Sequence, residues 1–537
     1  MADTTWITAA GPTPNGDLHI GHLAGPYVAA DVVRRHLCGS GTRVAMTTER
    51  DEHQSYVELI ARRDGVSAEV VADTYGARIE RSWKDAEIEF DACIRPRHEP
   101  GFVEFVQGFF TQLYEGGDLV TRKTPLPFCR ACRRWLYDGH LTGLCPHCGA
   151  ESGGEACEAC GRFNTHSDLL RPTCVSCGVE ADLVDGCRIF FPLAPYADQL
   201  RAFWQRVVMP THLRVLCEQM LAEGLPEIVV SHPSAWGIPV PLAGFEDQRL
   251  SATFEGAPVY LYQAGRAAEL LHLPLNYLTE ASSEASWVQF FGFDNGYFYA
   301  VVVPALLLAH DAKSRLPTAY VVNELYQLEG RKFSTSRRHA VWAGDLLATT
   351  DPDVLRFHVM KDRPVGRQTS FSMAALERTR EHLRQVWDGW VTRLLALAAD
   401  HGALVPPERP HGREWDILQA RLRCTLAEVV VAYSLPTLDL RRVTALLDEL
   451  VHLGVDFGHI QSHNGPAQAE ARAGALVAQL VVAQALAAWA SPLMPAACAR
   501  LARAIGYHDV LGVSDAALRV PEPGRRIEIP AGPIFGG

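Results

Sequence analysis

The chain has 537 residues, of which 48% are hydrophobic and 21% are charged, and its formal net charge at pH 7 is −12. This length predicts several domains, because it exceeds what one hydrophobic core spans. The composition is typical of a soluble globular protein. The acidic balance excludes a general basic coat for nucleic acid or for a membrane. The N-terminus has no basic leader before an apolar core, so we expect no signal peptide and a cytoplasmic protein.

The beginning of the chain indicates a nucleotide-binding α/β domain. Residues 4–10 and 42–49 are short apolar runs typical of buried strands, and residues 22–38 between them have a helical pattern. The sheet is expected to continue, after an interruption, in four further apolar runs at residues 227–233, 258–265, 287–294 and 318–330.

The interruption is rich in Cys, Gly and turn-forming residues, and we expect an insertion held by metal. It contains four Cys-x-x-Cys pairs: Cys129/Cys132, Cys145/Cys148, Cys157/Cys160 and Cys174/Cys177. Each pair places two thiolates on one tight turn, and two such turns complete a tetrahedral zinc site. The eight thiolates therefore predict two zinc ions. Full thiolate ligation leaves no open position, so both are expected to be structural.

From residue 371 onward the pattern is helical. One stretch, residues 473–499, has no charged residue and is long enough to span a bilayer. Gln479 and Gln484 interrupt this stretch and alanine dominates it. We therefore interpret it as a buried helix of a bundle and expect no membrane contact.

The predicted fold class is α/β, with a Rossmann-type nucleotide-binding domain split by a zinc-bearing insertion and followed by an α-helical bundle. The two halves of the nucleotide-binding domain are expected at residues 1–115 and 227–370, and the insertion at 116–226. The helical domain is expected over residues 371–510 and a C-terminal tail over 511–537.

Two motifs carry the chemistry. The first, "PNGDLHIGH" at residues 14–22, follows the first strand, where helix N-termini of a doubly wound fold point N–H groups at phosphates. His19 and His22 lie one turn apart and can donate hydrogen bonds to phosphate oxygens whose charge grows in a transition state. Alone, the pair is also consistent with an ordinary helix start. The second motif, "EGRKFSTSRR" at residues 329–338, is a Gly-, Lys- and Ser-rich loop.

Together these motifs resemble the HIGH and KMSKS signatures of class I aminoacyl-tRNA synthetases, and "HIGH" is literal at residues 19–22. Within that class the chain is most similar to the methionyl-tRNA synthetase family, over nearly its whole length. The similarity includes the zinc knuckles and four further segments: "DEH" at 51–53, "FFGFD" at 290–294, "KFSTS" at 332–336 and "DPDVLRFHVM" at 351–360.

The resemblance implies that the protein activates an amino acid with ATP and Mg²⁺, forming an aminoacyl-adenylate without a covalent enzyme intermediate. It implies catalytic roles for His19, His22, Lys332 and Ser336. It implies ATP-binding roles for Asn15, Gly16, Gly21, Gly292, Asp294 and Lys332. It also places Asp51 against the α-ammonium group of the substrate. In the family the outer two cysteine pairs share one zinc and the inner two share the other, and we expect the same nesting here.

The second motif departs from the family pattern at one position. The second lysine of KMSKS, which contacts the leaving phosphates, corresponds to Thr335, whereas Lys332 and Ser336 remain. Loss of such a charge-assisted contact costs on the order of 2–4 kcal/mol of barrier. We therefore expect slower or differently supported adenylation rather than a dead enzyme.

The residues at the positions of the methionine pocket depart more strongly from the family pattern. At the positions where the family encloses the thioether, this chain has Gly11, Thr13, Leu261, Gly265, Ala268, Asn295 and Tyr299. Much of the family's aromatic surface is missing from this set, which forfeits contact with an apolar substrate. We expect Arg266, Asn295 and Tyr299 to supply polar contacts, so methionine should be a poor substrate and the true one bulkier or more polar.

The helical domain also departs from the family pattern, at the positions that read the anticodon. The family reads the methionine anticodon with an asparagine, an arginine and a tryptophan, and the matching positions here are Leu395, Ala399 and Gln461. Direct base readout needs hydrogen-bonding or stacking side chains. Residues 371–537 contain 16 Arg and no Lys against 17 acidic residues, so the domain has no net attraction for RNA. We therefore expect that this protein reads the methionine anticodon in an altered way or not at all.

Three functions remain open. The first is a synthetase-like enzyme that transfers an activated amino acid to a tRNA or to an amine in a specialised pathway. The second is a divergent methionine–tRNA ligase of translation. The third is a non-catalytic, zinc-containing RNA-binding paralogue, which would have no reason to keep the ATP-binding residues together. We expect a monomer that binds an amino acid, ATP, Mg²⁺ and two structural zinc ions.

Overall fold

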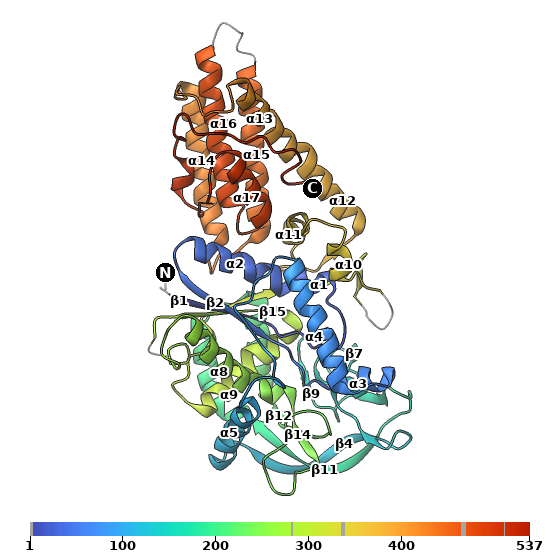
Figure 1. Ribbon diagram of the computed structural model, residues 1–537. Helices are drawn as coiled ribbons and strands as arrows, with labels where there is room; N and C mark the ends of the chain where they lie inside the picture. Colours follow the sequence, from blue (N-terminus) through green and yellow to red (C-terminus); the bar gives the residue numbers. More distant parts are fainter. Residues whose placement is uncertain are drawn as a thin grey trace. The chain divides into compact units, whose positions relative to one another are not determined.

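Figure 1 shows the computed structural model, in which the described residues are 4–157, 159–280, 283–333, 339–462, 469–509 and 511–536. The chain forms two compact units. The sheet unit comprises Met1–Leu18, Val44–Arg81 and Glu89–Leu325. The helical unit comprises His19–Arg43, Ser82–Ile88 and Tyr326–Gly537. His19, His22 and Lys332 therefore group with the helical unit, whereas the sequence predicts them in the two nucleotide-binding halves.

The sheet unit is built on a five-stranded sheet in the order β16-β15-β1-β2-β3. Its strands are β1 (Thr4–Ala9), β2 (Arg43–Glu49), β3 (Ala92–Ile94), β15 (Ser286–Gly292) and β16 (Ala319–Asn323). β1 pairs with β15, β15 with β16, and β2 with β3, each in parallel. All of β1 is buried, which is why its sequence is a continuous run rather than an alternating one.

One expected strand is wrong. Residues 258–265 lie inside helix α8 (Ala252–Leu270), which begins where the Ser251 hydroxyl accepts a hydrogen bond from the Phe254 N–H at 3.2 Å. α8 is buried over most of its length. Its sequence is therefore apolar on nearly every side, and a short apolar run does not distinguish a buried helix from a buried strand.

The zinc-knuckle insertion is an antiparallel β structure. Its long strands, β4 (Val120–Cys129) and β11 (Asp182–Pro192), pair along their length, and β12 (Glu227–Val229) lies beside β11. β13 (Ser231–Pro233) pairs with β14 (Gln248–Leu250). Residues 227–233 are therefore antiparallel strands outside the five-stranded sheet, which corrects the expectation that they continue it.

The remaining elements of the sheet unit are short strands in the insertion and helices around the core. The strands are β5 (Arg134–Trp135), β6 (Leu141–Leu144), β7 (Glu151–Ser152), β8 (Glu155–Ala156), β9 (Phe163–Asn164) and β10 (Leu170–Cys174). The helices are α3 (Ser55–Asp64), α4 (Ala68–Asp85), α5 (Phe102–Glu115), α6 (Ala197–Arg206), α7 (Thr211–Glu223) and α9 (Val303–His310). The end of α4 belongs to the helical unit.

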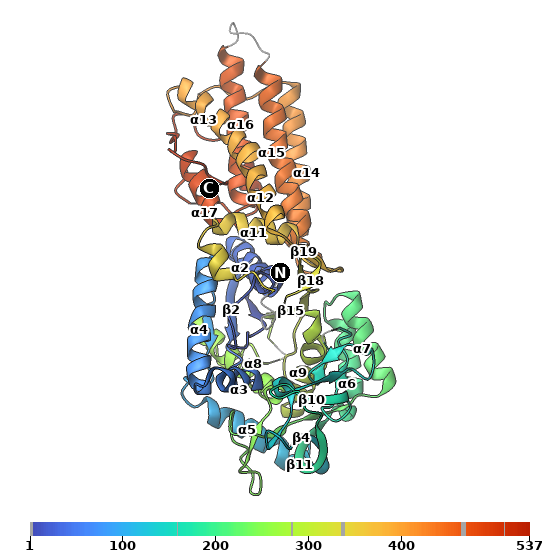
Figure 2. The same cartoon turned by 90° about the vertical axis from the view of Figure 1, so that its right-hand side faces the viewer.

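The helical unit contains the long helices of the C-terminal half, and α14, α15 and α16 run side by side (Figure 2). Its helices are α1 (Ile20–His22), α2 (Val28–Gly39), α10 (Ala343–Leu347), α11 (Pro352–Lys361), α12 (Met373–His382), α13 (Gly389–Asp400), α14 (Arg413–Tyr433), α15 (Leu440–Ser462), α16 (Ala469–Trp489) and α17 (Pro495–Ala504). Short strands β17 (Tyr326–Leu328), β18 (Arg331–Lys332) and β19 (Thr369–Phe371) form a separate sheet.

Helix α16 contains most of the uncharged stretch. By length and composition it could cross a membrane, but 89% of its most apolar window is buried inside the protein. Its Gln484 side chain donates a hydrogen bond to the Ala517 carbonyl at 3.1 Å, so the polar interruption is satisfied within the unit. This placement agrees with the predicted buried helix of a bundle.

A buried arginine ties the helical unit together. Arg356 on α11 and Asp31 on α2 are both fully buried, and Arg356 Nη2 lies 2.6 Å from Asp31 Oδ2. The guanidinium also donates to the carbonyls of Leu493 at 2.9 Å and of Ala86 and Glu87 at 3.2 Å. The buried charge is thus paired and its donors are used, which is the condition under which such a group is tolerated.

We predict that Arg356→Met lowers the free energy of unfolding of the helical unit by about 3–5 kcal/mol, because it leaves the Asp31 carboxylate buried and unpaired. Denaturant unfolding followed by far-UV circular dichroism measures the change. Arg393→Met on the exposed face of α13 is the control and should change little. Equal effects of the two substitutions would contradict the prediction.

Candidate active site

The histidine pair lies at a helix start in the helical unit. His19 is the N-cap of α1, where its Nδ1 accepts a hydrogen bond from the Gly21 N–H at 3.1 Å. Its own N–H donates to His22 Nδ1, also at 3.1 Å. The two rings stack with centroids 3.9 Å apart. Gly21 is needed there, because a Cβ would lie 3.0 Å from His19 Nδ1. The backbone therefore fixes the orientation of both rings.

Both imidazoles are neutral near pH 7. Burial lowers the pKa of His22 to about 4, although its backbone hydrogen bond with His19 opposes this. Burial, together with the neighbouring His22, holds the pKa of His19 well below its ordinary value. Since each Nδ1 accepts a backbone N–H, the single ring proton of each neutral imidazole is on Nε2. The pair thus carries two Nε2–H donors without positive charge.

Phe333 brings the second motif to the first within the helical unit. Its ring stacks on His19 with centroids 4.5 Å apart and 4° between the ring planes. It directly follows β18, where Lys332 lies opposite Gln327 of β17. Thr335 and Ser336 lie outside the described residues, as does the side chain of Lys332. The histidine motif and the start of the lysine loop are therefore joined by one aromatic contact.

In the sheet unit, the loop after β1 is bonded to the loop after β2. The Asp51 N–H donates to the Pro12 carbonyl at 3.1 Å, and the Thr13 hydroxyl donates to Asp51 Oδ2 at 3.4 Å. The Asn15 N–H donates to the Thr13 carbonyl at 2.9 Å, which turns the chain before Gly16. The structure therefore brings Thr13 and Asp51 together.

Asp51 belongs to a group of carboxylates, of which Glu255 is buried and Asp51 is half-buried. Burial raises the pKa of Asp51 to about 7, against the hydrogen bond from Gln54, which lowers it. Glu255 on α8 lies 2.9 Å from His53 Nδ1. Burial disfavours the charged form of His53, but the charge and hydrogen bond of Glu255 outweigh it and raise its pKa. The histidine therefore forms an ion pair with Glu255, and its charge also acts to lower the pKa of Asp51. Asp51 has no ion-pair partner of its own among the described residues.

Glu49, the last residue of β2, joins this group, and no sequence motif singles it out. A Cβ at Gly11 would lie 2.4 Å from Glu49 Cγ and 3.1 Å from its Oε1, so the glutamate occupies the space that a side chain at position 11 would take. Burial, then the charges of Asp51 and Glu255, holds the pKa of Glu49 well above its ordinary value. Gly11 therefore makes room for a carboxylate.

Gly292 and Asp294 lie together after β15. A Cβ on Gly292 would be 2.4 Å from Asp294 Oδ1, so only glycine lets this carboxylate approach the strand end. Burial raises the pKa of Asp294, while backbone hydrogen bonds at Asp294 and Asn295 oppose the rise. A carboxylate at the carboxyl end of a parallel strand is suited to a nucleoside hydroxyl.

The expected polar contacts need correction at two positions. Arg266 is half-exposed on α8 and its Nη1 lies 2.5 Å from Glu269 Oε2, three residues along the same helix. Asn295 is also exposed. Both side chains project from helical turns toward solvent, so neither provides a buried contact. Tyr299 is buried and stacks on Phe291 at 4.3 Å. Along α8, Ala268 is buried, whereas Leu261 and Gly265 are partly exposed.

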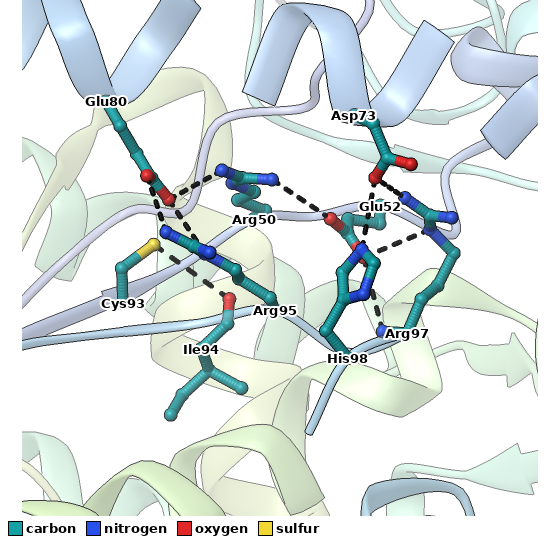
Figure 3. A network of polar contacts seen from close by, with 9 residues as sticks. All are labelled: Arg50, Glu52, Asp73, Glu80, Cys93, Ile94, Arg95, Arg97 and His98. Carbon is teal, nitrogen blue, oxygen red and sulfur yellow. Dashed lines mark hydrogen bonds and ion pairs between the residues drawn. The ribbon is translucent and has the colours of Figure 1, made fainter. Parts of the chain in front are cut away.

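Arginines and carboxylates hold the segments on either side of Asp51 (Figure 3). Arg50 Nη2 and Arg95 Nη2 each lie 2.6 Å from an oxygen of Glu80. Glu52, which is fully buried, lies 3.6 Å from Arg50 Nη1 and 3.2 Å from Arg97 Nε. The charges that flank Asp51 in the sequence are thus paired with one another, and the loop that carries Asp51 is held at both ends.

Two groups of four cysteines fit a tetrahedral metal. The outer group is Cys129, Cys132, Cys174 and Cys177, and the inner group is Cys145, Cys148, Cys157 and Cys160. Within the groups, the hydrogen-bonded Sγ pairs are 3.5–3.9 Å apart. Four thiolates around zinc at 2.3 Å lie about 3.8 Å from one another. The nesting expected from the family is therefore the one that the structure has.

Two further groups of metal-ligating residue types have contacts with other side chains, although neither ring nitrogen of His232 has a hydrogen-bond partner among the described residues. In the insertion, His166 Nε2 lies 2.6 Å from Asp138 Oδ1, and the neighbouring His232 ring stacks on Tyr137 at 4.4 Å. Glu52, Asp73 and His98 form the second group. The carboxylates of that group are paired with arginine in the network of Figure 3.

In the helical unit, the structure describes in full two of the three positions that the family resemblance matches to anticodon-reading residues. Leu395 is buried in the bundle, so its side chain is not available to RNA. Ala399 is exposed but offers no hydrogen-bonding or stacking group. The side chain of Gln461 lies outside the described residues.

We predict two zinc ions per chain, with Cys145→Ser and Cys174→Ser each removing one, because each group of four loses a ligand. Elemental analysis of purified protein measures the content. Cys424→Ser, at an exposed cysteine of α14 outside both groups, is the control and should retain both ions. A single ion in the unmodified protein would contradict the prediction.

Comparisons with known proteins agree with this geometry. Residues 5–395 match the family described as tRNA synthetases class I (M). The methionine–tRNA ligase of Thermomicrobium roseum is 32% identical over 423 residues, covering 77% of this chain and 72% of that protein. The methionine–tRNA ligase of Pyrobaculum islandicum is 31% identical over 402 residues, covering 74% and 70%.

A solved structure is similar in fold. It is Mycobacterium tuberculosis methionyl-tRNA synthetase in complex with methionyl-adenylate, which matches with a TM-score of 0.81 and 20% identity and covers 99% of both chains. This likeness confirms the predicted α/β fold with its helical C-terminal region. The family match, the sequence identities and the shared fold lead to one conclusion: the chain belongs to the class I tRNA synthetases of the methionyl group.

Proposed function

We propose that this protein is an ATP-dependent enzyme that converts an amino acid to its aminoacyl-adenylate and passes the acyl group to an acceptor. The observation that carries the proposal is the stacked, neutral pair His19 and His22, with Phe333 of the lysine loop against it. A non-catalytic RNA-binding paralogue would not need this arrangement, nor the Gly292–Asp294 approach at the end of β15.

The histidines act as hydrogen-bond donors to the phosphates. Their Nε2–H groups stabilise negative charge on phosphate oxygens as the substrate carboxylate attacks the α-phosphate of ATP and pyrophosphate leaves. Because the nucleophile belongs to the substrate, the protein supplies position and electrostatics rather than a covalent intermediate. Mg²⁺ would neutralise part of the phosphate charge. Asp294 would accept a hydrogen bond from the nucleoside, and Lys332 would contact the leaving phosphates.

Asp51 binds the α-ammonium of the amino acid in this proposal. Its half-buried carboxylate accepts a hydrogen bond from the Thr13 hydroxyl, and its backbone N–H donates to the Pro12 carbonyl. No cation of the sheet unit forms an ion pair with it among the described residues. A charge-assisted hydrogen bond to an ammonium would compensate it.

The acceptor is proposed to be a tRNA or an amine in a specialised pathway, with altered anticodon readout. Leu395 is buried and Ala399 has no polar group, so neither reads a base. The balance of 16 Arg against 17 acidic residues beyond residue 370 also gives no electrostatic attraction for RNA. We propose that the enzyme is cytoplasmic and monomeric.

A second candidate is a divergent methionine–tRNA ligase of translation. It is favoured by the identity of about one residue in three to proteins of that name. Charging of a methionine tRNA transcript, compared with charging of a transcript whose anticodon is changed, distinguishes the two candidates. Efficient and anticodon-dependent charging with methionine would establish the second.

For the catalytic groups, we predict that His22→Ala and Lys332→Ala each lower adenylate formation by on the order of 100-fold or more, since each removes a donor to developing phosphate charge. Amino-acid-dependent ATP–pyrophosphate exchange measures the rate. Thr335→Lys should leave the rate equal or raise it by restoring a second cation. Arg266→Ala, at an exposed arginine, is the control. Unchanged exchange by Lys332→Ala would overturn the role of the loop.

For Asp51, we predict that the KM for the amino acid rises as the pH falls below about 7. The pKa of Asp51 is about 7, and only its ionised form, present above that pH, binds an ammonium. Well below the pKa the KM should rise about tenfold per pH unit. The KM for ATP, measured in the same exchange assays between pH 5.5 and 8, serves as the internal control. A flat KM for the amino acid over that range would contradict the assignment.

A further inference from the structure

Two polar side chains, the buried Gln289 and the half-buried Glu49, have no partner among the described residues and lie on one face of the five-stranded sheet. The Trp6 indole N–H donates to the Thr47 hydroxyl at 2.9 Å, and Trp6 stacks on Trp287 at 4.5 Å, so these three side chains share a face. Side chains alternate between faces along a strand. Glu49, two residues after Thr47, and Gln289, two residues after Trp287, therefore share this face too, toward the carboxyl ends of the strands.

Helix α8 and the segment after β15 cover this face. The Thr47 hydroxyl donates to Gln263 Oε1 on α8 at 2.8 Å, and the Tyr260 ring of α8 lies 5.5 Å from Trp287. Tyr299, one of the positions at which the family encloses its substrate, lies 6.2 Å from Tyr260. The side chains that cover this face are mostly aromatic. A polar group buried among them is destabilising unless it has a hydrogen-bond partner.

Gln289 has no hydrogen-bond partner for its side chain in the part of the chain that the structure describes. Its side chain is 1% exposed, and neither Oε1 nor Nε2 has a hydrogen-bond partner in the described residues. A buried amide left unpaired is destabilising, and such groups in native proteins usually have a partner. A bound molecule with polar groups of its own would supply one.

Glu49 likewise has no hydrogen-bond or ion-pair partner among the residues that the structure describes. The two nearest basic side chains in the sequence are paired elsewhere. Arg50 lies 2.6 Å from Glu80 (Figure 3), and His53 lies 2.9 Å from Glu255. The carboxylate that takes the place of a side chain at position 11 is therefore uncompensated.

A substrate with a neutral side chain would leave one carboxylate of the site without an opposite charge. The α-ammonium of an amino acid compensates one carboxylate, Asp51, and His53 compensates Glu255. Glu49 then remains. An apolar side chain such as that of methionine would bury this carboxylate without a partner, which is strongly unfavourable. A second cation on the substrate would complete the pairing.

We infer that the amino acid activated by this protein is a diamino acid, whose side-chain ammonium binds Glu49 and whose pocket includes Gln289. The inference rests on the proposed function, because it concerns the same site. Gly11 is part of the same arrangement. Because it has no side chain, it leaves space for the side chain of Glu49, and a leucine there would exclude it.

The test is ATP–pyrophosphate exchange with diaminopropionate, diaminobutyrate, ornithine and lysine against methionine and norleucine. The kcat/KM should be about 100-fold or more higher for one of the diamino acids than for either neutral one. Glu49→Gln, which has nearly the same shape, should remove most of this preference and leave the KM for ATP unchanged. Glu104→Gln, at an exposed position of α5, is the control. Methionine activation as efficient as that of every diamino acid, or a preference unaffected by Glu49→Gln, would overturn the inference.

Calorimetric binding of the same amino acids separates this inference from the proposed function. Absence of exchange with every amino acid would overturn the proposed function. In that case diamino acid binding to the unmodified protein, lost in Glu49→Gln, would still support the role of Glu49, and no binding would overturn it. The double variant Gly11→Leu/Glu49→Ala should shift binding toward methionine, because a leucine then fills the space that the glutamate side chain occupied. If binding does not shift, the proposed role of Glu49 in selecting the substrate is contradicted.

Discussion

The burial of carboxylates where the strands end is the constraint on which this molecule depends. Glu49 and Asp51 follow one another along β2 and its loop, and burial raises the pKa of both. A desolvated carboxylate needs an opposite charge or strong donors. His53 forms an ion pair with Glu255, whereas Glu49 and Asp51 have no ion-pair partner among the described residues. In the proposed function, the two carboxylates without an ion-pair partner define the positive charges that the substrate must carry.

The arginines and carboxylates next to these residues are paired with one another. Glu52 lies between Arg50 and Arg97, and Arg50 also pairs with Glu80. In the helical unit, Arg356 is buried with Asp31 and several carbonyl groups. Such pairing keeps the loops and helices in one arrangement at the price of desolvation. The contrast between compensated scaffold charges and uncompensated site charges is what marks the site.

The histidine pair solves a different electrostatic problem. Two imidazolium groups stacked at 3.9 Å would repel one another, and burial prevents this by keeping both rings neutral. The backbone hydrogen bonds to each Nδ1 then decide the tautomer, so that each ring donates through Nε2. Phe333 and Gly21 shape the space around His19. Preorganised neutral donors of this kind stabilise charge that develops on a phosphate without reorganising.

The sequence alone determined the features that depend on local spacing: strands β1, β2 and β15, the helix start at His19, the zinc knuckles and the apolar helix α16. Family resemblance supplied the nesting of the cysteines. Only the tertiary structure decided the rest. It showed that residues 258–265 are a helix, because a short and mostly buried apolar run has no polar face that reveals its period. It turned Arg266 toward Glu269 and placed Glu49 in the space beside Gly11, because contacts between distant segments depend on how the strands and helices pack, which spacing along the chain does not contain.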